Sequence, residues 1–362
     1  MDTSFDFGGS TRILVTLNGN RLTGSVSPHV MAHASPIWNK FLFPPFKKLE
    51  SSINIESNGS QSAGDREISR DSHLNVEPSE ELDFSEDPAE ALRLLLSIVH
   101  FKFNNIPVQL NLAHLWQVAM LCDQYDCVHL VKPWLSNWLA TEDSAWQGAK
   151  AVQRENWLFV AWVFGRQKVF GELAQLLVLE TSVNSSGKCS AQYSGAGYGP
   201  MPPDIIEGIL RIRKKAIAGL LEITRKCCQE YITVLKPPPP SYMYSYQQQD
   251  RKKALCKHGH QGCDAISYGS LMGGLEAIGV KTSTTADLIE INVKQLAEKI
   301  NGLTIHVYPP TNDGYKRVTH EACFTTNIKD EVAKVLSTVE NPVLESHLRH
   351  LSTQATKLSH VS

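Results

Sequence analysis

The sequence predicts an α+β fold in which a small sheet near the N-terminus is followed by a mainly α-helical C-terminal region. Apolar residues alternate in a short stretch that begins at Arg12, which is the period of a half-buried strand. Beyond Asp87 they recur every three or four positions, as in amphipathic helices. The chain has 362 residues, of which 42% are hydrophobic and 20% charged, enough for two or three compact units.

A β-hairpin is predicted directly after a disordered N-terminus at residues 1–10. Ile13, Val15 and Leu17 alternate, and Asn18-Gly19-Asn20 then supplies a turn. A second alternating stretch follows this turn. The domain that begins with this hairpin is predicted to span residues 11–140.

Two short helices are expected after the hairpin. Ser27-Pro28 and Ser35-Pro36 each combine a capping side chain with a proline suited to a first helical turn. The second helix is expected to direct Trp38 into the core. From about residue 48 to residue 80 the chain is rich in polar residues and nearly free of aromatic ones, so a disordered insert is predicted there.

Order resumes with a short strand at residues 81–84, followed by several helices. Asp87-Pro88, with Glu90 close behind, is typical of a helix start. Further helices are expected from Asn111 and after Asp126. Their aromatic stripe is interpreted as core packing, and it consists of Trp116, Trp134 and Trp138.

Three segments of this region are similar to a known family. Residues 30–38 (VMAHASPIW) match a helix that ends in a Ser-Pro and aromatic pair, and residues 86–91 (EDPAEA) precede a leucine-rich helix. The most specific segment is residues 118–127 (VAMLCDQYDC), which resembles the "ALADKYD" type of helix end. In this order the segments resemble the BTB/POZ family, in particular the BTB proteins common in fungi.

The resemblance implies a protein that acts by binding other proteins. It implies self-association as a homodimer through the BTB-like domain, or docking onto a larger complex. One alternative is a substrate adaptor of a cullin-type ubiquitin ligase. Residues 263–265 and 269–271 also resemble a "CDA…GSL" segment in the C-terminal region of the fungal group.

The rest of the chain divides by composition and apolar periodicity. The predicted segments are a helical extension at 141–183, a flexible linker at 184–203, a long amphipathic helix at 204–235, a Pro/Gln-rich linker at 236–252, and a Cys/His-containing helical region at 253–352. In the long helix, Arg211, Arg213 and Lys214 are expected to face solvent.

Within the last region the sequence predicts four helices and one extended segment. The helices are expected at residues 264–278, 287–300, 328–339 and 342–351, with a break at Asn341-Pro342. Residues 302–308 alternate in hydrophobicity and predict a short strand or an extended segment.

Cysteines and histidines cluster in this last region. Cys256 and Cys263 flank His258 and His260, while His320 and Cys323 follow at a spacing that lets both face one metal ion. His258 or His260 is the substitute ligand. The alternative interpretation is a buried cysteine pair beside an exposed histidine-rich turn. The preferred metal-ligand set is Cys256, Cys263, His320 and Cys323, which would hold one structural zinc ion.

Composition and motifs weigh against other classes of function. No nucleophile elbow, P-loop or HExxH motif occurs, so we expect a protein that is not an enzyme and takes no small-molecule substrate. The net charge of −2 comes from 35 basic and 37 acidic residues and does not favour nucleic acid. A zinc-containing nuclear regulator that contacts nucleic acid is the remaining alternative, supported by residues 211–215 and 251–253. Without a leader or an apolar span, an intracellular protein is expected, in nucleus or cytoplasm.

Overall fold

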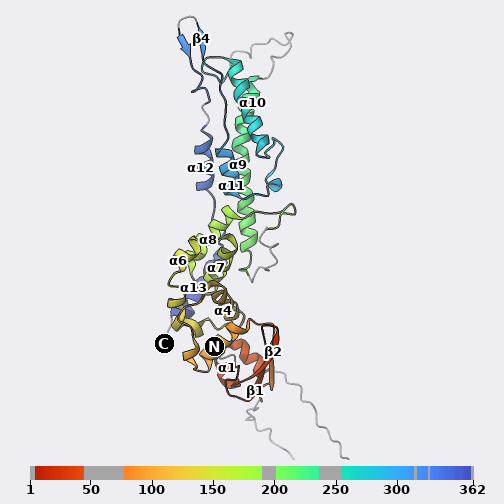
Figure 1. The fold of residues 1–362 in the computed structure, drawn as a ribbon, viewed down its shortest axis with the longest axis vertical. Coiled ribbons are helices and arrows are strands. Elements are labelled where there is room, and N and C mark those ends of the chain that lie inside the picture. Colours follow the sequence, from red (N-terminus) through yellow and green to blue (C-terminus); the bar gives the residue numbers. More distant parts are fainter. Residues whose placement is uncertain are drawn as a thin grey trace, which may run out of the picture. The chain divides into compact units, whose positions relative to one another are not determined.

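The computed structural model describes residues 5–44, 77–189, 201–235, 254–313, 316–324 and 327–359. The chain forms two compact units, whose elements are labelled in Figure 1. The first comprises Met1–Gln147, Phe159–Arg166 and His350–Ser362, and the second comprises Gly148–Leu158 and Gln167–Arg349. The predicted linker at 236–252 and most of the predicted insert at 48–80 lie outside the described residues. So does most of the linker at 184–203.

The first unit contains the predicted hairpin and the short strand that follows it. Strands β1 (Thr11–Leu17) and β2 (Asn20–Val26) are antiparallel, and β3 (Glu81–Phe84) pairs in parallel with β1. The sheet order is therefore β2-β1-β3. Ile13 and Val15 on β1 are fully buried, so the alternating pattern identified the core face of the sheet.

The expected disorder at residues 1–10 is wrong for the part of this segment that the structure describes. The Phe5 side chain is buried, and the Phe7 N–H donates to the Ser25 carbonyl at 2.8 Å. Gly24 permits this approach, because a Cβ atom there would lie 2.2 Å from the Phe5 carbonyl oxygen. The segment is ordered because it pairs with β2.

Helices complete the first unit. They are α1 (Pro28–Ala34), α2 (Pro36–Leu42), α3 (Ala89–Val99), α4 (Leu112–Gln124), α5 (Lys132–Trp138) and α6 (Glu142–Gln147). Ser35 caps α2 by accepting from the N–H groups of Ile37 and Trp38, and its hydroxyl donates to the Tyr125 carbonyl at 2.6 Å. Trp38 is fully buried, as predicted. Of the aromatic stripe, Trp138 is buried, whereas Trp116 and Trp134 are half-buried.

The predicted helical extension is helical, but it is divided between the two units. It contains α6, α7 (Ala151–Val163) and α8 (Gln167–Glu180). Phe159–Arg166 belongs to the first unit, while α8 belongs to the second. The boundary of the first unit therefore differs from the predicted end at residue 140.

The second unit is organised around α9 (Ile205–Leu235), which confirms the predicted long amphipathic helix. α8, α10 (Gln261–Ala277), α11 (Val293–Asn301) and α12 (Ile328–Ser337) all pack against it (Figure 1). Their shared core includes Ile217, Leu220, Leu271 and Leu296, each fully buried. A two-stranded hairpin of β4 (Thr311–Asp313) and β5 (Lys316–Val318) completes the unit.

Arg213 corrects the expectation that the basic residues of this helix face solvent. Its side chain is 3% exposed and donates to the carbonyls of Thr181, Ile289 and Ile291 at 2.7 to 2.8 Å. These bonds anchor residues 289–291, and Ile289 has an extended backbone. The predicted helix at 287–300 accordingly begins only at Val293, behind a capping box of Asn292 and Gln295.

The C-terminal helices also differ from their predicted bounds. α12 ends at Ser337, two residues before the predicted end, and α13 runs over Glu345–Ser359 rather than 342–351. Leu351 is fully buried, and the helical spacing continues to the half-buried Leu358. No helix in the described part of the chain is both long and apolar enough to span a bilayer.

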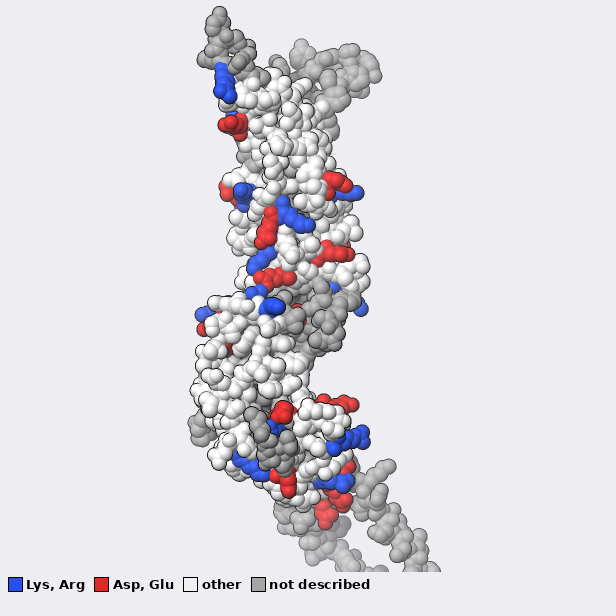
Figure 2. Space-filling model, in the orientation of Figure 1, with Lys and Arg blue, Asp and Glu red and all other residues white. Residues whose placement is uncertain are grey.

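The visible face of the molecule carries charges of both signs. In Figure 2, Lys and Arg side chains alternate with Asp and Glu side chains across this face. Lys214 is paired with Asp287 at 2.7 Å, and Lys215 with Glu340. Since Arg213 is buried, residues 211–215 do not present a row of free cations to a phosphate backbone.

Candidate functional site

The second unit brings together the four residues of the predicted metal-ligand set. One ligand atom from each of Cys256, Cys263, His320 and Cys323 lies within 4.8 Å of all the others. The four side chains are between 1% and 6% exposed. This buried cluster could hold a metal ion.

Two tight turns present the four ligands. In the first, the Gly259 N–H donates to the Cys256 carbonyl at 2.9 Å, and Gly259 has a φ of 72°, which favours glycine. The turn leads into the first turn of α10, which carries Cys263. In the second, the Cys323 N–H donates to the His320 carbonyl at 2.9 Å.

The spacing of the ligand atoms suits a tetrahedral ion. The Sγ atoms of Cys256 and Cys323 are 3.6 Å apart, and His320 Nδ1 lies 3.4 Å and 3.7 Å from them respectively. A tetrahedral zinc ion with Zn–S bonds of about 2.3 Å would place its sulfur ligands about 3.8 Å apart. Because the Nδ1 atom of His320 is the ring nitrogen near both sulfur atoms, His320 faces the cluster through Nδ1.

A buried carboxylate fixes the first turn. Asp264 is 2% exposed and accepts hydrogen bonds from the N–H groups of Leu255 and Cys256 at 2.9 and 2.8 Å. It follows Cys263 directly in α10, so it ties both cysteines to one rigid element. This is the role that outer-shell carboxylates have in metal sites.

The predicted extended segment at 302–308 supports the cluster from another side. The Ser267 hydroxyl donates to the His306 carbonyl at 3.1 Å, and the His306 N–H donates to the Ser270 hydroxyl at 2.9 Å. These bonds hold the segment along α10. Tyr308 at its end packs against the cysteines, and its ring centroid is 5.5 Å from that of His320.

The thiols respond differently to this environment. Burial acts to raise the pKa of Cys256, but backbone N–H groups of His260 and His258 outweigh it, so that the pKa is lowered. Burial raises the pKa of Cys263 to about 11. Burial also lowers the pKa of His320, and the nearby His258 and His260 act in the same direction.

The two substitute ligands lie beside the cluster and are not part of it. His258 and His260 are exposed, and their ring centroids are 5.2 and 5.6 Å from that of His320. His320 Nε2 is buried, and it has no hydrogen-bond partner among the described residues.

A second feature, in the first unit, is an exposed aromatic ridge formed by Phe101, Phe103 and Trp134. The first two side chains are 74% and 49% exposed. The ring centroids of Phe101 and Phe103 are 6.0 Å apart in an edge-on contact, and those of Phe103 and Trp134 are 5.7 Å apart. Phe101 has a φ of 61°, a conformation that is rare for a bulky residue.

Lys102, which lies between the two phenylalanines in the chain, contacts the N-terminal segment. Its Nζ atom donates to the Asp6 carbonyl at 2.8 Å and lies 4.7 Å from the centroid of the Phe7 ring. The cation is therefore held over Phe7 and the N-terminal segment. The three side chains of the ridge itself are uncharged.

No family model, no curated protein and no solved structure matches this chain.

The sequence pattern identified the four side chains that cluster here but missed the residues around them. The sequence predicts Asp264 to lie in a helix, and no local pattern marks its second role, because it bonds to the N–H groups of residues eight and nine positions earlier. Phe101 and Phe103 were not singled out. The sequence feature that indicates an exposed loop here is a lysine flanked by two aromatic residues, between two predicted helices.

Proposed function

We propose that this chain is a non-enzymatic protein–protein interaction protein that self-associates through a BTB/POZ-like N-terminal domain. The order of elements in the first unit supports this proposal. A hairpin is followed by two helices that begin at Ser-Pro pairs, by a strand parallel to β1, and by further helices. The three segments that resemble the BTB/POZ family, at residues 30–38, 86–91 and 118–127, lie among these elements.

The aromatic ridge is the observation that carries the interaction function. Exposed clusters of large apolar residues are typical of protein-binding surfaces, and a strained backbone is retained where the surrounding structure or the function requires it. At Phe101 both occur together, since the residue has a positive φ and is 74% exposed.

A second copy of this chain is the partner that the ridge favours. In a two-fold dimer the same patch contacts itself, so a charged patch would place like charges opposite each other. The three ridge side chains are uncharged, and the Lys102 ammonium is bonded to the Asp6 carbonyl. Aromatic residues are also enriched in interface cores.

The same surface would serve the alternative function of docking onto a larger assembly, including a cullin-type ubiquitin ligase. Proximity labelling in the native cell, with wild type and with Phe101→Asn/Phe103→Ser, separates the two functions. Labelling of a second, separately tagged copy of the chain, abolished by the double substitution, supports the homodimer. If the wild type labels a cullin and the double variant does not, the result would favour the adaptor function over self-association.

For the metal cluster we propose one structural zinc ion. Three thiolates and one imidazole are a zinc-type ligand set, and four protein ligands leave no open position for catalysis. Elemental analysis of the purified chain tests this. We expect about one zinc ion per chain, lost in Cys263→Ser and retained in Cys228→Ser, whose thiol is buried elsewhere in the same unit. Wild-type protein without stoichiometric metal would refute the zinc site.

A further inference from the structure

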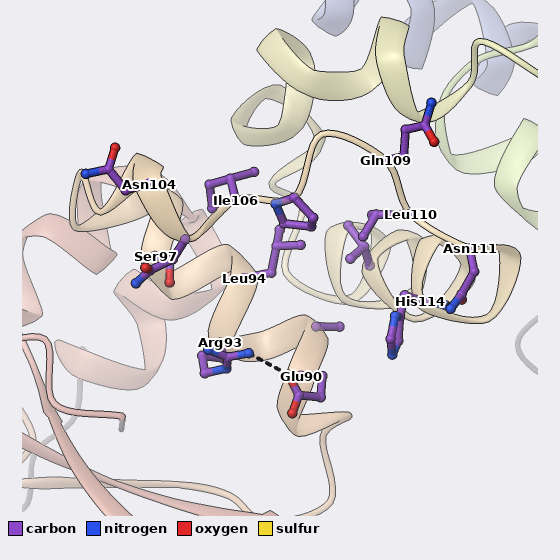
Figure 3. Close-up of a pocket in the computed structure, with 14 residues that line it drawn as sticks. Glu90, Arg93, Leu94, Ser97, Asn104, Ile106, Gln109, Leu110, Asn111 and His114 are labelled. Atoms are coloured by element: carbon purple, nitrogen blue, oxygen red, sulfur yellow. Dashed lines mark hydrogen bonds and ion pairs between the residues drawn. The ribbon is translucent and has the colours of Figure 1, made fainter. Parts of the chain in front are cut away.

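A groove in the first unit lies between α3 and the segment that leads into α4 (Figure 3). Its volume is about 470 Å³, which falls in the range of about 300 to 1,000 Å³ that is usual for ligand pockets. Leu94 of α3 and Ile106 and Leu110 of the connecting segment supply apolar lining. The groove can therefore take a large apolar group.

Side-chain amides line the groove beside this apolar surface. Asn104, Asn105 and Gln109 are exposed, and no hydrogen bond within the described part of the chain engages their side chains. Asn111 differs, because its side chain already caps α4 by accepting from the His114 N–H at 2.9 Å. Three amides thus offer both donors and acceptors to a ligand.

The charged residues of the groove neutralise each other. Glu90 and Arg93 are paired at 2.7 Å, as the dashed line in Figure 3 marks. No other Lys, Arg, Asp or Glu is among the described residues that line the groove. The groove therefore favours an uncharged ligand over an acidic or basic one.

We propose that this groove binds an extended peptide segment of a partner protein, with one bulky apolar side chain against Leu94, Ile106 and Leu110. An extended backbone has free N–H and C=O groups that can pair with the amides of Asn104, Asn105 and Gln109. A helix would leave these amides unpaired, because its backbone groups bond to each other. The inference rests on the proposed interaction function and names a class of partner for it.

Peptide selection on the full-length chain tests this inference. Random linear peptides displayed on phage are selected against the wild type, and a selected peptide is then synthesised and titrated. We expect the selected peptides to share one large apolar residue among uncharged neighbours. The double substitution Asn105→Ala/Gln109→Ala should weaken binding about tenfold, since it removes two hydrogen-bonding side chains. Leu94→Arg should abolish binding.

Asn137→Ala is the matched control, because it removes an exposed amide elsewhere in the first unit. The double substitution changes only exposed side chains, so it tests the groove even if Leu94→Arg fails to fold. Selection of no peptide, or equal binding by the wild type and the double variant, would overturn the inference. If the chain is still dimeric in that case, the proposed self-association stands and only the groove is rejected.

Discussion

The Nδ1 atom of His320 lies 3.4 Å from the Sγ atom of Cys256, although 64 positions separate the two residues in the chain. The contact joins the turn before α10 to the turn after β5. Among the described residues, the apolar side chains packed against the cysteine cluster are Ala254 and Tyr308, so neither turn has an extensive apolar core there. The proposed zinc ion would therefore hold this end of the second unit together.

Removal of the metal is expected to loosen both turns. Chelation should accelerate amide hydrogen exchange in residues 254–263 and 316–323, while exchange in β1 and β2 of the first unit stays unchanged. Mass spectrometry of peptic fragments measures both regions in one experiment. Unchanged exchange near the cysteines after the metal has been removed would contradict a structural role.

Asp264→Asn is expected to weaken the metal site without removing a ligand. The substitution replaces a carboxylate that accepts from the N–H groups of Leu255 and Cys256. Loss of such an outer-shell group typically lowers metal affinity about 10- to 100-fold. Competition with a chromophoric chelator measures the change. Asp287→Asn, at an exposed ion pair with Lys214, should leave the affinity unchanged.

Arg213→Met is expected to destabilise the second unit by about 1 to 3 kcal/mol, because it leaves the carbonyls of Thr181, Ile289 and Ile291 without their donor. Urea denaturation monitored by circular dichroism measures the free energy of unfolding. Arg211→Met is the control, since Arg211 is exposed on the same helix. Equal effects of the two substitutions would show that the bonds of Arg213 contribute nothing specific.

Arg213 also shows where sequence reasoning failed. The cluster at residues 211–215 was interpreted as a solvated basic face, but Arg213 lies four residues after Ile209 and four before Ile217, on the buried side of α9. The helical spacing indicated that Arg213 is buried, whereas its positive charge favoured the interpretation that it faces solvent. Burial of the Arg213 guanidinium is possible because it donates to carbonyls of residues 181 and 289–291. These residues are distant in the chain, so no local sequence pattern predicts the bonds.

Other parts of the structure were accessible from the sequence. Alternation identified β1, Ser35 identified the start of α2, and the Cys and His pattern identified the four side chains that cluster. These features depend on local periodicity or on residue chemistry. The ordered segment at residues 5–10 was missed because it depends on the space beside Gly24 in another strand.

Glu155 is expected to make stability depend on pH. Burial raises the pKa of this carboxyl from 4.5 to about 7 in the folded chain. Between these pH values the folded state holds a proton that the unfolded state has lost, so the free energy of unfolding should fall as pH rises from 4.5 to about 7. The total loss is at most about 3 kcal/mol.

Glu155→Gln should flatten this pH dependence and stabilise the chain at neutral pH. Denaturation curves at a series of pH values test this, with the exposed Glu207→Gln as control. If the free energy of unfolding changes with pH equally in the wild type and in Glu155→Gln between pH 4.5 and 7, Glu155 does not bind the proton that stabilises the folded state.

The aromatic ridge should carry self-association without stabilising the fold. In Phe101→Asn/Phe103→Ser, asparagine tolerates the positive φ at position 101 better than phenylalanine. The free energy of unfolding of the monomer should therefore change by less than about 1 kcal/mol. Denaturation at low protein concentration checks that the variant is folded.

Light scattering on the full-length chain after size exclusion tests the proposed self-association most directly. The wild type should have twice the mass of one chain, and Phe101→Asn/Phe103→Ser should have the mass of one chain at the same concentration. A wild type that stays monomeric as its concentration is raised, or a folded double variant that remains dimeric, would contradict self-association through the aromatic ridge.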